Sequence, residues 1–133
     1  MGNEEKIFVS RFLEKAKSAL DDAEFNTGNN RYYTALNRIY YSIFYSVMSL
    51  GYLDNFITSK HKQLMGWFNK KYIYEEKIFD ENLSKIYKEA YENRMESDYE
   101  TSLPTSKDEI SANLEKAKLF VNTLSDFIHN KLK

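Results

Sequence analysis

The stretch "ALNRIYYSIFYSVMSL" (Ala35–Leu50) decides the fold of this chain. Five apolar residues in it are separated by alternating steps of four and three: Leu36, Tyr40, Ile43, Val47 and Leu50. This spacing returns to one face of an α-helix, and further apolar residues beside that face widen it. The pattern therefore predicts a helix over about residues 30–50, and we expect it to be the most buried helix of the molecule.

The same periodicity predicts four more helices, over residues 4–25, 58–71 and 80–99 and from residue 106 onward. No segment shows the strict alternation of a half-buried strand. Short connections between long amphipathic helices favour antiparallel neighbours. We therefore predict an all-α protein, an up-and-down antiparallel bundle of four to five helices, with residues 1–133 forming one domain.

Side chains near the expected helix ends refine these boundaries. Gly28 suits the end of the first helix, and the asparagines around it suit the start of the second. Thr58 or Ser59 can cap the third helix, and Asp80 the fourth. A capping-box pattern, S-x-x-E, begins at Ser106 and marks the start of the fifth helix. The loops over residues 51–57 and 71–79 are then the longest and the most mobile.

Composition excludes several classes of function. The chain has no cysteine and two histidines, and no HExxH-type spacing, so we expect neither a disulfide nor a metal site nor a cofactor. The formal net charge of −1 excludes a uniformly basic nucleic-acid binder, but it allows a local basic patch. There is no signal-peptide pattern and no apolar run of about 18 residues, so the chain is expected to be cytoplasmic and independent of membranes.

Two charged residues stand where the fourth helix should be apolar. The apolar positions Leu83, Tyr87 and Ala90 continue at Arg94 and Asp98, which are four residues apart on one face. One interpretation is a structural ion pair that shields Arg94 inside the bundle. The other is a guanidinium group that Asp98 orients so that it binds a phosphate.

Polar residues on the second and third helices are further candidates. Asn37 lies beside the buried face, where an amide is expected to bond across helices, and Tyr41 is either a core residue or a ligand contact. Lys60 and His61 stand in the first turn of the third helix, in a stretch from residue 60 to 74 with four lysines and no acid. Such a helix start favours anions, although a lone histidine there is usually solvated or a cap. The stretch is either a phosphate- or RNA-binding edge or an ordinary solvated face.

Three segments, in this order, resemble the HEPN-domain family. "ALNRIYYSIFYSVMSL" is similar to its second helix with paired tyrosines, and "SKHKQLMGWF" (Ser59–Phe68) to the start of its third. "YKEAYENRMESDYE" (Tyr87–Glu100) resembles the arginine-bearing helix of a sub-group with the motif R-x-x-x-D-Y. The resemblance extends over about residues 5–125.

This resemblance implies a helical bundle that dimerises and brings two arginine-bearing helices together around a cleft. Many members are metal-independent endoribonucleases with the motif R-x(4-6)-H, and prokaryotic members are often toxins encoded beside a minimal nucleotidyltransferase antitoxin. Arg94 matches the arginine of that motif. Tyr99, Glu100 and Thr101 occupy the positions at which its histidine would stand.

The leading interpretation is therefore a HEPN-type protein that binds RNA or a nucleotide phosphate within a toxin–antitoxin-like pair and that, if active, cleaves RNA without a metal. Arg94 would bind the phosphate, Asp98 would orient Arg94, and Tyr99 would hydrogen-bond the ligand or be a target of modification. The expected phosphate or RNA contacts are Asn37, Tyr41, Lys60 and His61. The alternative is a non-catalytic dimeric interaction module in which Arg94 and Asp98 form a structural ion pair.

Overall fold

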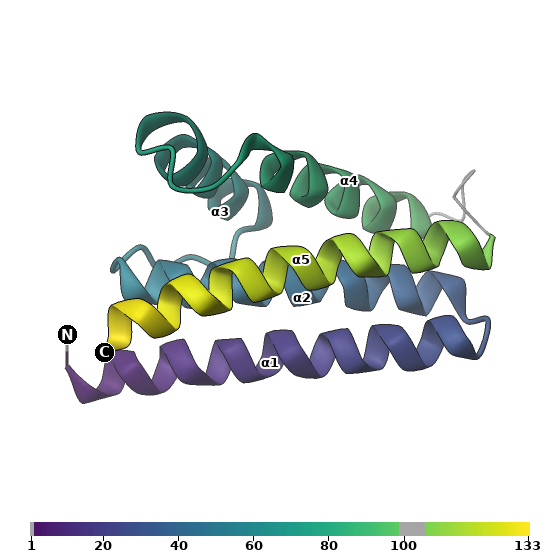
Figure 1. Ribbon diagram of the computed structural model, residues 1–133, viewed down its shortest axis with the longest axis horizontal. Helices are drawn as coiled ribbons and strands as arrows, with labels where there is room; N and C mark the ends of the chain where they lie inside the picture. The colour runs from purple at the N-terminus through teal and green to yellow at the C-terminus, as the bar shows by residue number, and fades with distance from the viewer. Residues whose placement is uncertain (1, 99–105) are drawn as a thin grey trace.

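The computed structural model describes residues 2–98 and 106–133. Its elements are α1 (Asn3–Gly28), α2 (Tyr32–Leu53), α3 (His61–Phe68), the π-helix η1 (Asn69–Glu75), α4 (Glu81–Asp98) and α5 (Lys107–Leu132) (Figure 1). The described residues contain no strand. This confirms the predicted all-α bundle.

The helices form two layers. The long helices α1, α2 and α5 lie side by side, and α3 and α4 form a second layer over α2 (Figure 1). Twelve of the 22 residues of α2 are buried, and it contacts α1, α3, α4 and α5, as expected of the most buried helix. One cluster of buried hydrophobic residues draws on both layers. The extent of the domain, residues 1–133, stays a prediction.

The starts of α4 and α5 agree with the predicted caps. The Asp80 carboxylate accepts a hydrogen bond from the backbone N–H of Asn82 at 2.8 Å. The Ser106 hydroxyl accepts one from the backbone N–H of Glu109 at 3.2 Å. Each bond satisfies an N–H group that the first turn of a helix leaves unpaired. The predicted loop around Pro104 lies outside the described residues.

The predicted end of the first helix was wrong. α1 continues through Gly28, because the side-chain amides of Asn26 and Asn29 donate to backbone carbonyls one turn earlier, at 2.7 and 2.8 Å. The chain then reverses at Asn30, which has a positive φ of 59°. No asparagine caps α2 either, because the residue before it is Arg31, which makes no side-chain capping bond. Asparagine takes the left-handed conformation more readily than most residues, so glycine was not needed for this turn.

At the end of α2 a glycine is required. Gly51 lies inside the helix, although the prediction placed it in a loop. The N–H of Phe56 donates to the Gly51 carbonyl at 2.8 Å. A Cβ atom at Gly51 would lie 2.5 Å from the Phe56 carbonyl oxygen, closer than atoms can approach. The missing side chain therefore allows the chain to fold back tightly toward α3.

The third helix differs from its prediction at both ends. It begins at His61, and neither Thr58 nor Ser59 caps it. The Thr58 hydroxyl instead accepts from the N–H of Lys60 at 3.2 Å and bonds to Gln63 at 2.6 Å. At its other end the helix continues as η1, so residues 71–75 of the predicted loop are helical.

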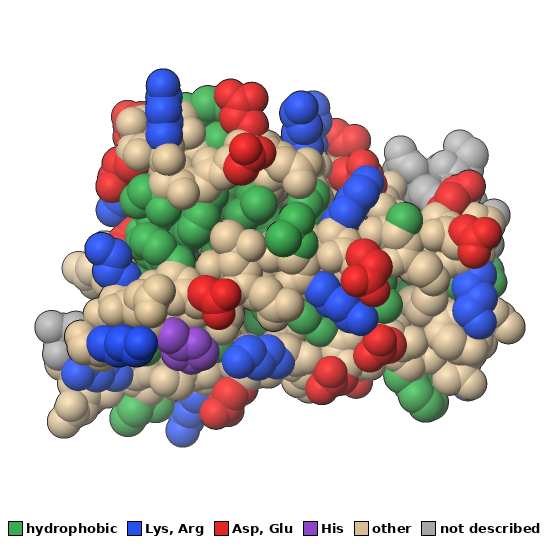
Figure 2. Space-filling view, in the orientation of Figure 1, with side chains coloured by type: hydrophobic (Ala, Val, Ile, Leu, Met, Phe, Trp, Pro, Cys, Tyr) green, Lys and Arg blue, Asp and Glu red, His purple; other side chains and the backbone are tan. Residues whose placement is uncertain are grey.

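Aromatic contacts attach the second layer to the first. Phe68 is fully buried, and its ring centre lies 5.8 Å from that of Tyr87 on α4 and 5.5 Å from that of Phe120 on α5. Trp67 stacks on Phe56, with ring centres 4.9 Å apart and planes within 4°. Hydrophobic side chains also gather in a hollow between α3 and α5 (Figure 2). Among the described helices none is both long enough and apolar enough to cross a membrane.

Candidate functional site

Arg94 lies at the junction of α2 and α4, against two tyrosine rings. Its guanidinium carbon is 5.6 Å from the ring centre of Tyr40 and 5.5 Å from that of Tyr41. Nη2 donates to the Tyr41 hydroxyl at 3.4 Å. A guanidinium group over aromatic rings is attracted by their negative faces. These contacts give Arg94 a fixed place at the edge of the core.

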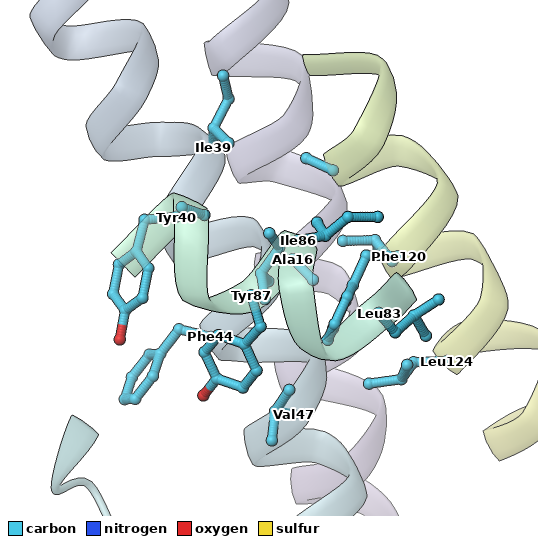
Figure 3. Packing of buried hydrophobic residues seen from close by; sticks show 14 of the residues in the cluster. Ala16, Ile39, Tyr40, Phe44, Val47, Leu83, Ile86, Tyr87, Phe120 and Leu124 are labelled. Atoms are coloured by element: carbon cyan, nitrogen blue, oxygen red, sulfur yellow. The ribbon is translucent and has the colours of Figure 1, made fainter. Parts of the chain in front are cut away.

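His61 reaches the same two rings from the start of α3. Its ring stacks on Phe44 with centres 4.3 Å apart, and lies 5.5 and 5.9 Å from the ring centres of Tyr40 and Tyr41. Nδ1 is 2.6 Å from the Tyr40 hydroxyl. Tyr40 and Phe44 project from α2 beside Tyr87 of α4 (Figure 3). His61 therefore belongs to a packed aromatic cluster, and its expected contact with a phosphate or RNA stays a prediction.

This environment sets the protonation of both groups. Burial, and to a smaller extent the charge of Arg94, lowers the pKa of His61 below its usual 6.5, so the imidazole is neutral at neutral pH. Burial raises the pKa of the Tyr40 hydroxyl far above its usual value, although Arg94 opposes that rise. A neutral hydroxyl can donate to Nδ1 or accept from it. The other ring nitrogen, Nε2, can accordingly serve as a donor or as a proton acceptor.

A second guanidinium group lies on the Tyr41 ring. The guanidinium carbon of Arg38 is 5.2 Å from the ring centre. Asn37 accepts two hydrogen bonds from it, from Nε at 3.0 Å and from Nη2 at 2.8 Å. Asn37 was expected to bond across helices, but its amide instead orients the next residue on α2. Arg38 was not among the predicted site residues, although its position three residues before Tyr41 is the spacing of neighbours on a helix.

The remaining candidates lie outside this cluster or outside the described residues. Lys60 precedes α3 and is exposed. Lys71, from the same lysine-rich stretch, pairs with Asp54 at 3.1 Å. Asp98 ends α4, but its side chain and all of Tyr99 lie outside the described residues. The roles of Asp98 and Tyr99 stay predictions.

Comparison with protein families assigns the chain to a family. The family model described as the HEPN domain matches residues 9–127. The chain belongs to the HEPN family. The resemblance found in the sequence is thereby confirmed for nearly the whole length.

Two relatives of this HEPN chain are similar over most of their length. The UPF0332 protein of Thermotoga maritima is 28% identical over 128 residues, which cover 96% of each chain. A protein of Methanocaldococcus jannaschii named "Putative toxin MJ0142" is 31% identical over 124 residues, which cover 92% of this chain and 83% of the relative.

The HEPN chain thus has an arginine and a histidine at one place, but from different helices. Arg94 comes from α4 and His61 from α3, and both contact the rings of Tyr40 and Tyr41. The sequence analysis named both residues but did not predict that they lie close together. Their proximity depends on how α3 docks on α2, and no local spacing in the sequence encodes that docking.

Proposed function

We propose that this HEPN protein binds RNA at the cluster of Arg94, His61, Tyr40, Tyr41 and Arg38 and cleaves it without a metal ion. The observation that carries the proposal is that Arg94 and His61 lie against the same two tyrosine rings. Together they offer a fixed positive charge and a titratable imidazole, which can stabilise the charge and transfer the proton when a phosphodiester is cleaved without a metal.

In this proposal the two arginines, Arg94 and Arg38, bind the phosphate. A guanidinium group presents paired N–H donors that match two oxygens of a phosphate. Arg94 and Arg38 are held against the Tyr41 ring, so little side-chain freedom remains to be lost on binding. In the transition state negative charge grows on the non-bridging oxygens, and preorganised guanidinium groups stabilise it. Asp98 would orient Arg94, and Tyr99 would contact the ligand.

In this proposal His61 accepts the proton of the attacking hydroxyl group. When Nδ1 carries its hydrogen and donates to Tyr40, Nε2 is free to accept a proton from a ribose 2′-hydroxyl. That oxygen attacks the adjacent phosphorus, the bond from phosphorus to the 5′-oxygen breaks, and the 5′-oxygen takes up a proton from water. His61 then releases the proton that it accepted to the solvent. The products are a 2′,3′-cyclic phosphate and a 5′-hydroxyl end. No metal takes part in this route.

The biological setting that we propose is a toxin–antitoxin pair. Two relatives from Methanocaldococcus jannaschii carry the word toxin in their names, which supports a toxin-like role here. The family resemblance adds a homodimer and a minimal nucleotidyltransferase as the antitoxin. In such a pair, an RNA-cleaving or RNA-binding site on this chain would be what the partner restrains.

Incubation of the purified protein with varied single-stranded RNAs in excess EDTA tests this function. We expect cleavage that leaves cyclic phosphate ends. Arg94→Ala or His61→Ala should lower the rate by roughly two to four orders of magnitude, because each removes a group that acts in the transition state. Arg31→Gln, at the exposed arginine before α2, is the matched control and should cleave normally. Absence of cleavage by the wild type across RNAs and salt concentrations would exclude the nuclease function.

The internal contacts of Arg94 favour a second candidate, a non-catalytic interaction module. Its hydrogen bond to Tyr41 and its two ring contacts are those of a structural residue. Thermal melting of the same Arg94→Ala variant separates the two functions. A structural role predicts a large fall in Tm, whereas an RNA-binding role predicts a small change in Tm together with loss of phosphate binding.

A further inference from the structure

A row of aromatic rings from α1 and α2 leads away from Arg94. We call it the aromatic strip, and its members in order are Tyr41, Tyr45, Phe12, Tyr52 and Phe8. Successive ring centres are 5.6, 6.2, 5.3 and 5.1 Å apart. The last three rings stack, with planes within 20° of each other between neighbours. The strip begins on the ring that Arg94 and Arg38 contact, so it is continuous with the proposed RNA site.

The strip lies at the surface. None of its five rings is among the buried residues, and Phe8 is 42% exposed. Its members recur on α2 and on α1 at helical spacing, which places them along the facing edges of the two helices. Tyr41, Tyr45 and Tyr52 are partly buried and pack against the core, so each presents only part of its ring to solvent.

Basic side chains lie beside the rings of the aromatic strip. The Lys15 ammonium nitrogen is 5.3 Å from the ring centres of both Phe12 and Tyr45. Arg11 lines, together with Phe8 and Tyr52, a shallow hollow of about 190 Å³ on the strip. Among the described residues, no carboxylate forms an ion pair with Arg11 or Lys15. Glu14 is the one acid that lines the adjoining depressions, against three cations, Lys6, Arg11 and Lys15.

We propose that the aromatic strip binds single-stranded RNA next to the phosphate held by Arg94. Bases would stack on the accessible rings, and backbone phosphates would meet Arg11 and Lys15. Sequence-tolerant binding of single strands uses this combination of aromatic platforms and a basic groove. The proposal rests on the proposed function and specifies its substrate as an unpaired chain of several nucleotides rather than a mononucleotide or a duplex.

The charges favour RNA over a second copy of the chain. A two-fold interface places the same patch on both sides, so a dimer through the strip would set a patch with Lys6, Arg11, Lys15 and one acid against an identical patch of the same net positive charge. Like charges at an interface disfavour association. A polyanion neutralises all of them and releases counterions as it binds.

The test compares two ligands that the protein cannot cleave because their 2′-hydroxyls are methylated. One is a dinucleotide, measured by calorimetry, and the other is a radiolabelled strand of about 12 nucleotides, within the usual span of a single-strand site and measured by filter binding. The strip variant carries Arg11→Gln and Lys15→Gln. The matched control carries Lys17→Gln and Arg31→Gln, which remove the same charge at exposed positions away from the strip.

The strip variant should bind the long strand roughly tenfold more weakly, and its salt dependence (log K against log salt concentration) should flatten by about 1.4, since each lost phosphate contact removes about 0.7. Its affinity for the dinucleotide should be unchanged, as should both affinities of the control. Phe8→Ala, at an exposed position, should also lower the affinity for the long strand and leave the affinity for the dinucleotide unchanged. This variant tests stacking separately from charge.

Unchanged affinity of the strip variant for the long strand would overturn this inference. It would leave the proposed function standing if Arg94→Ala still abolishes dinucleotide binding. If instead Arg94→Ala binds both ligands normally while the strip variant loses affinity for the long strand, the proposed function is wrong, and the strip binds RNA independently of Arg94. A dimer that dissociates in the strip variant, with RNA affinity per protomer unchanged, would identify the strip as a contact between copies and overturn the inference.

Discussion

At the residue scale, Arg94 affects the protonation of its neighbour His61. It lies against Tyr40 and Tyr41, and its charge reinforces the effect of burial in lowering the pKa of His61. Because the pKa of His61 is lower in the folded than in the unfolded chain, its neutral state contributes fully to stability above about pH 6.5. That contribution is lost as the pH falls further, since the unfolded chain then binds more protons.

Replacement of Arg94 should therefore change the pKa of His61. We expect Arg94→Gln to raise the pKa of His61 toward 6.5, because a nearby positive charge that opposes imidazole protonation is removed. Arg38→Gln is the matched control, since Arg38 contacts Tyr41 but does not contribute to the shift at His61. Titration of the His61 ring protons by NMR measures both. Identical midpoints in Arg94→Gln and the wild type would show that the two side chains do not interact.

At the scale of the helices, the sequence predicted the caps of α4 and α5 but not where α1 and α3 end. The caps at Asp80 and Ser106 were predictable because a side chain within three residues of the N–H group makes the bond. The π-helical turn of η1 was not predictable, because it extends α3 without any break in its apolar pattern. The continuation of α1 from residue 25 to Gly28 is accompanied by two asparagine side chains that donate to carbonyls of the preceding turn and do not cap the next helix.

On α4, one side chain costs stability. Tyr87 is fully buried against Phe68 and Phe120, and within the described part of the chain its hydroxyl has no hydrogen-bond partner. Burial raises its pKa well above the usual value, so the group is an uncharged but unsatisfied hydroxyl. Tyr87→Phe removes that cost while it keeps the ring.

We expect Tyr87→Phe to stabilise the protein by about 1–2 kcal/mol, which corresponds to a rise in Tm of roughly 3–8 °C for a chain of this size. Tyr40→Phe is the matched control and should lower Tm, because the Tyr40 hydroxyl bonds to His61. Calorimetric melting of the two variants gives both values. A lower Tm in Tyr87→Phe would indicate that its hydroxyl is satisfied in solution.

At the scale of the whole molecule, the bundle followed from periodicity, whereas the site did not. Leu36, Tyr40 and Ile43 on one face are enough to predict a buried helix. Arg94 was found because it interrupts an apolar stripe. The meeting of Arg94 with His61 arises only when the second layer docks on the first, which no pattern along the chain records. The predicted homodimer likewise depends on contacts beyond one chain.

For the dimer implied by the family resemblance, we expect sedimentation at about twice the chain mass of 15.8 kDa. Met95, next to Arg94 on α4, is 36% exposed and would lie near a second copy if the arginine-bearing helices meet. Met95→Lys should then shift the protein toward monomer, because it places a charge at an apolar contact. Leu119→Lys, at an exposed leucine on α5, is the control. A monomeric wild type at micromolar concentration would contradict the implied dimer.

The stack of Trp67 on Phe56 has a practical consequence for studies of folding. Trp67 is the single tryptophan of the chain, and it lies in the second layer rather than among α1, α2 and α5. Its emission therefore reports the docking of α3, while circular dichroism is dominated by the long helices. If the second layer detaches before the bundle unfolds, the two signals will change at different denaturant concentrations. The molecule thus carries an intrinsic fluorophore that separates assembly of the candidate site from unfolding of the scaffold.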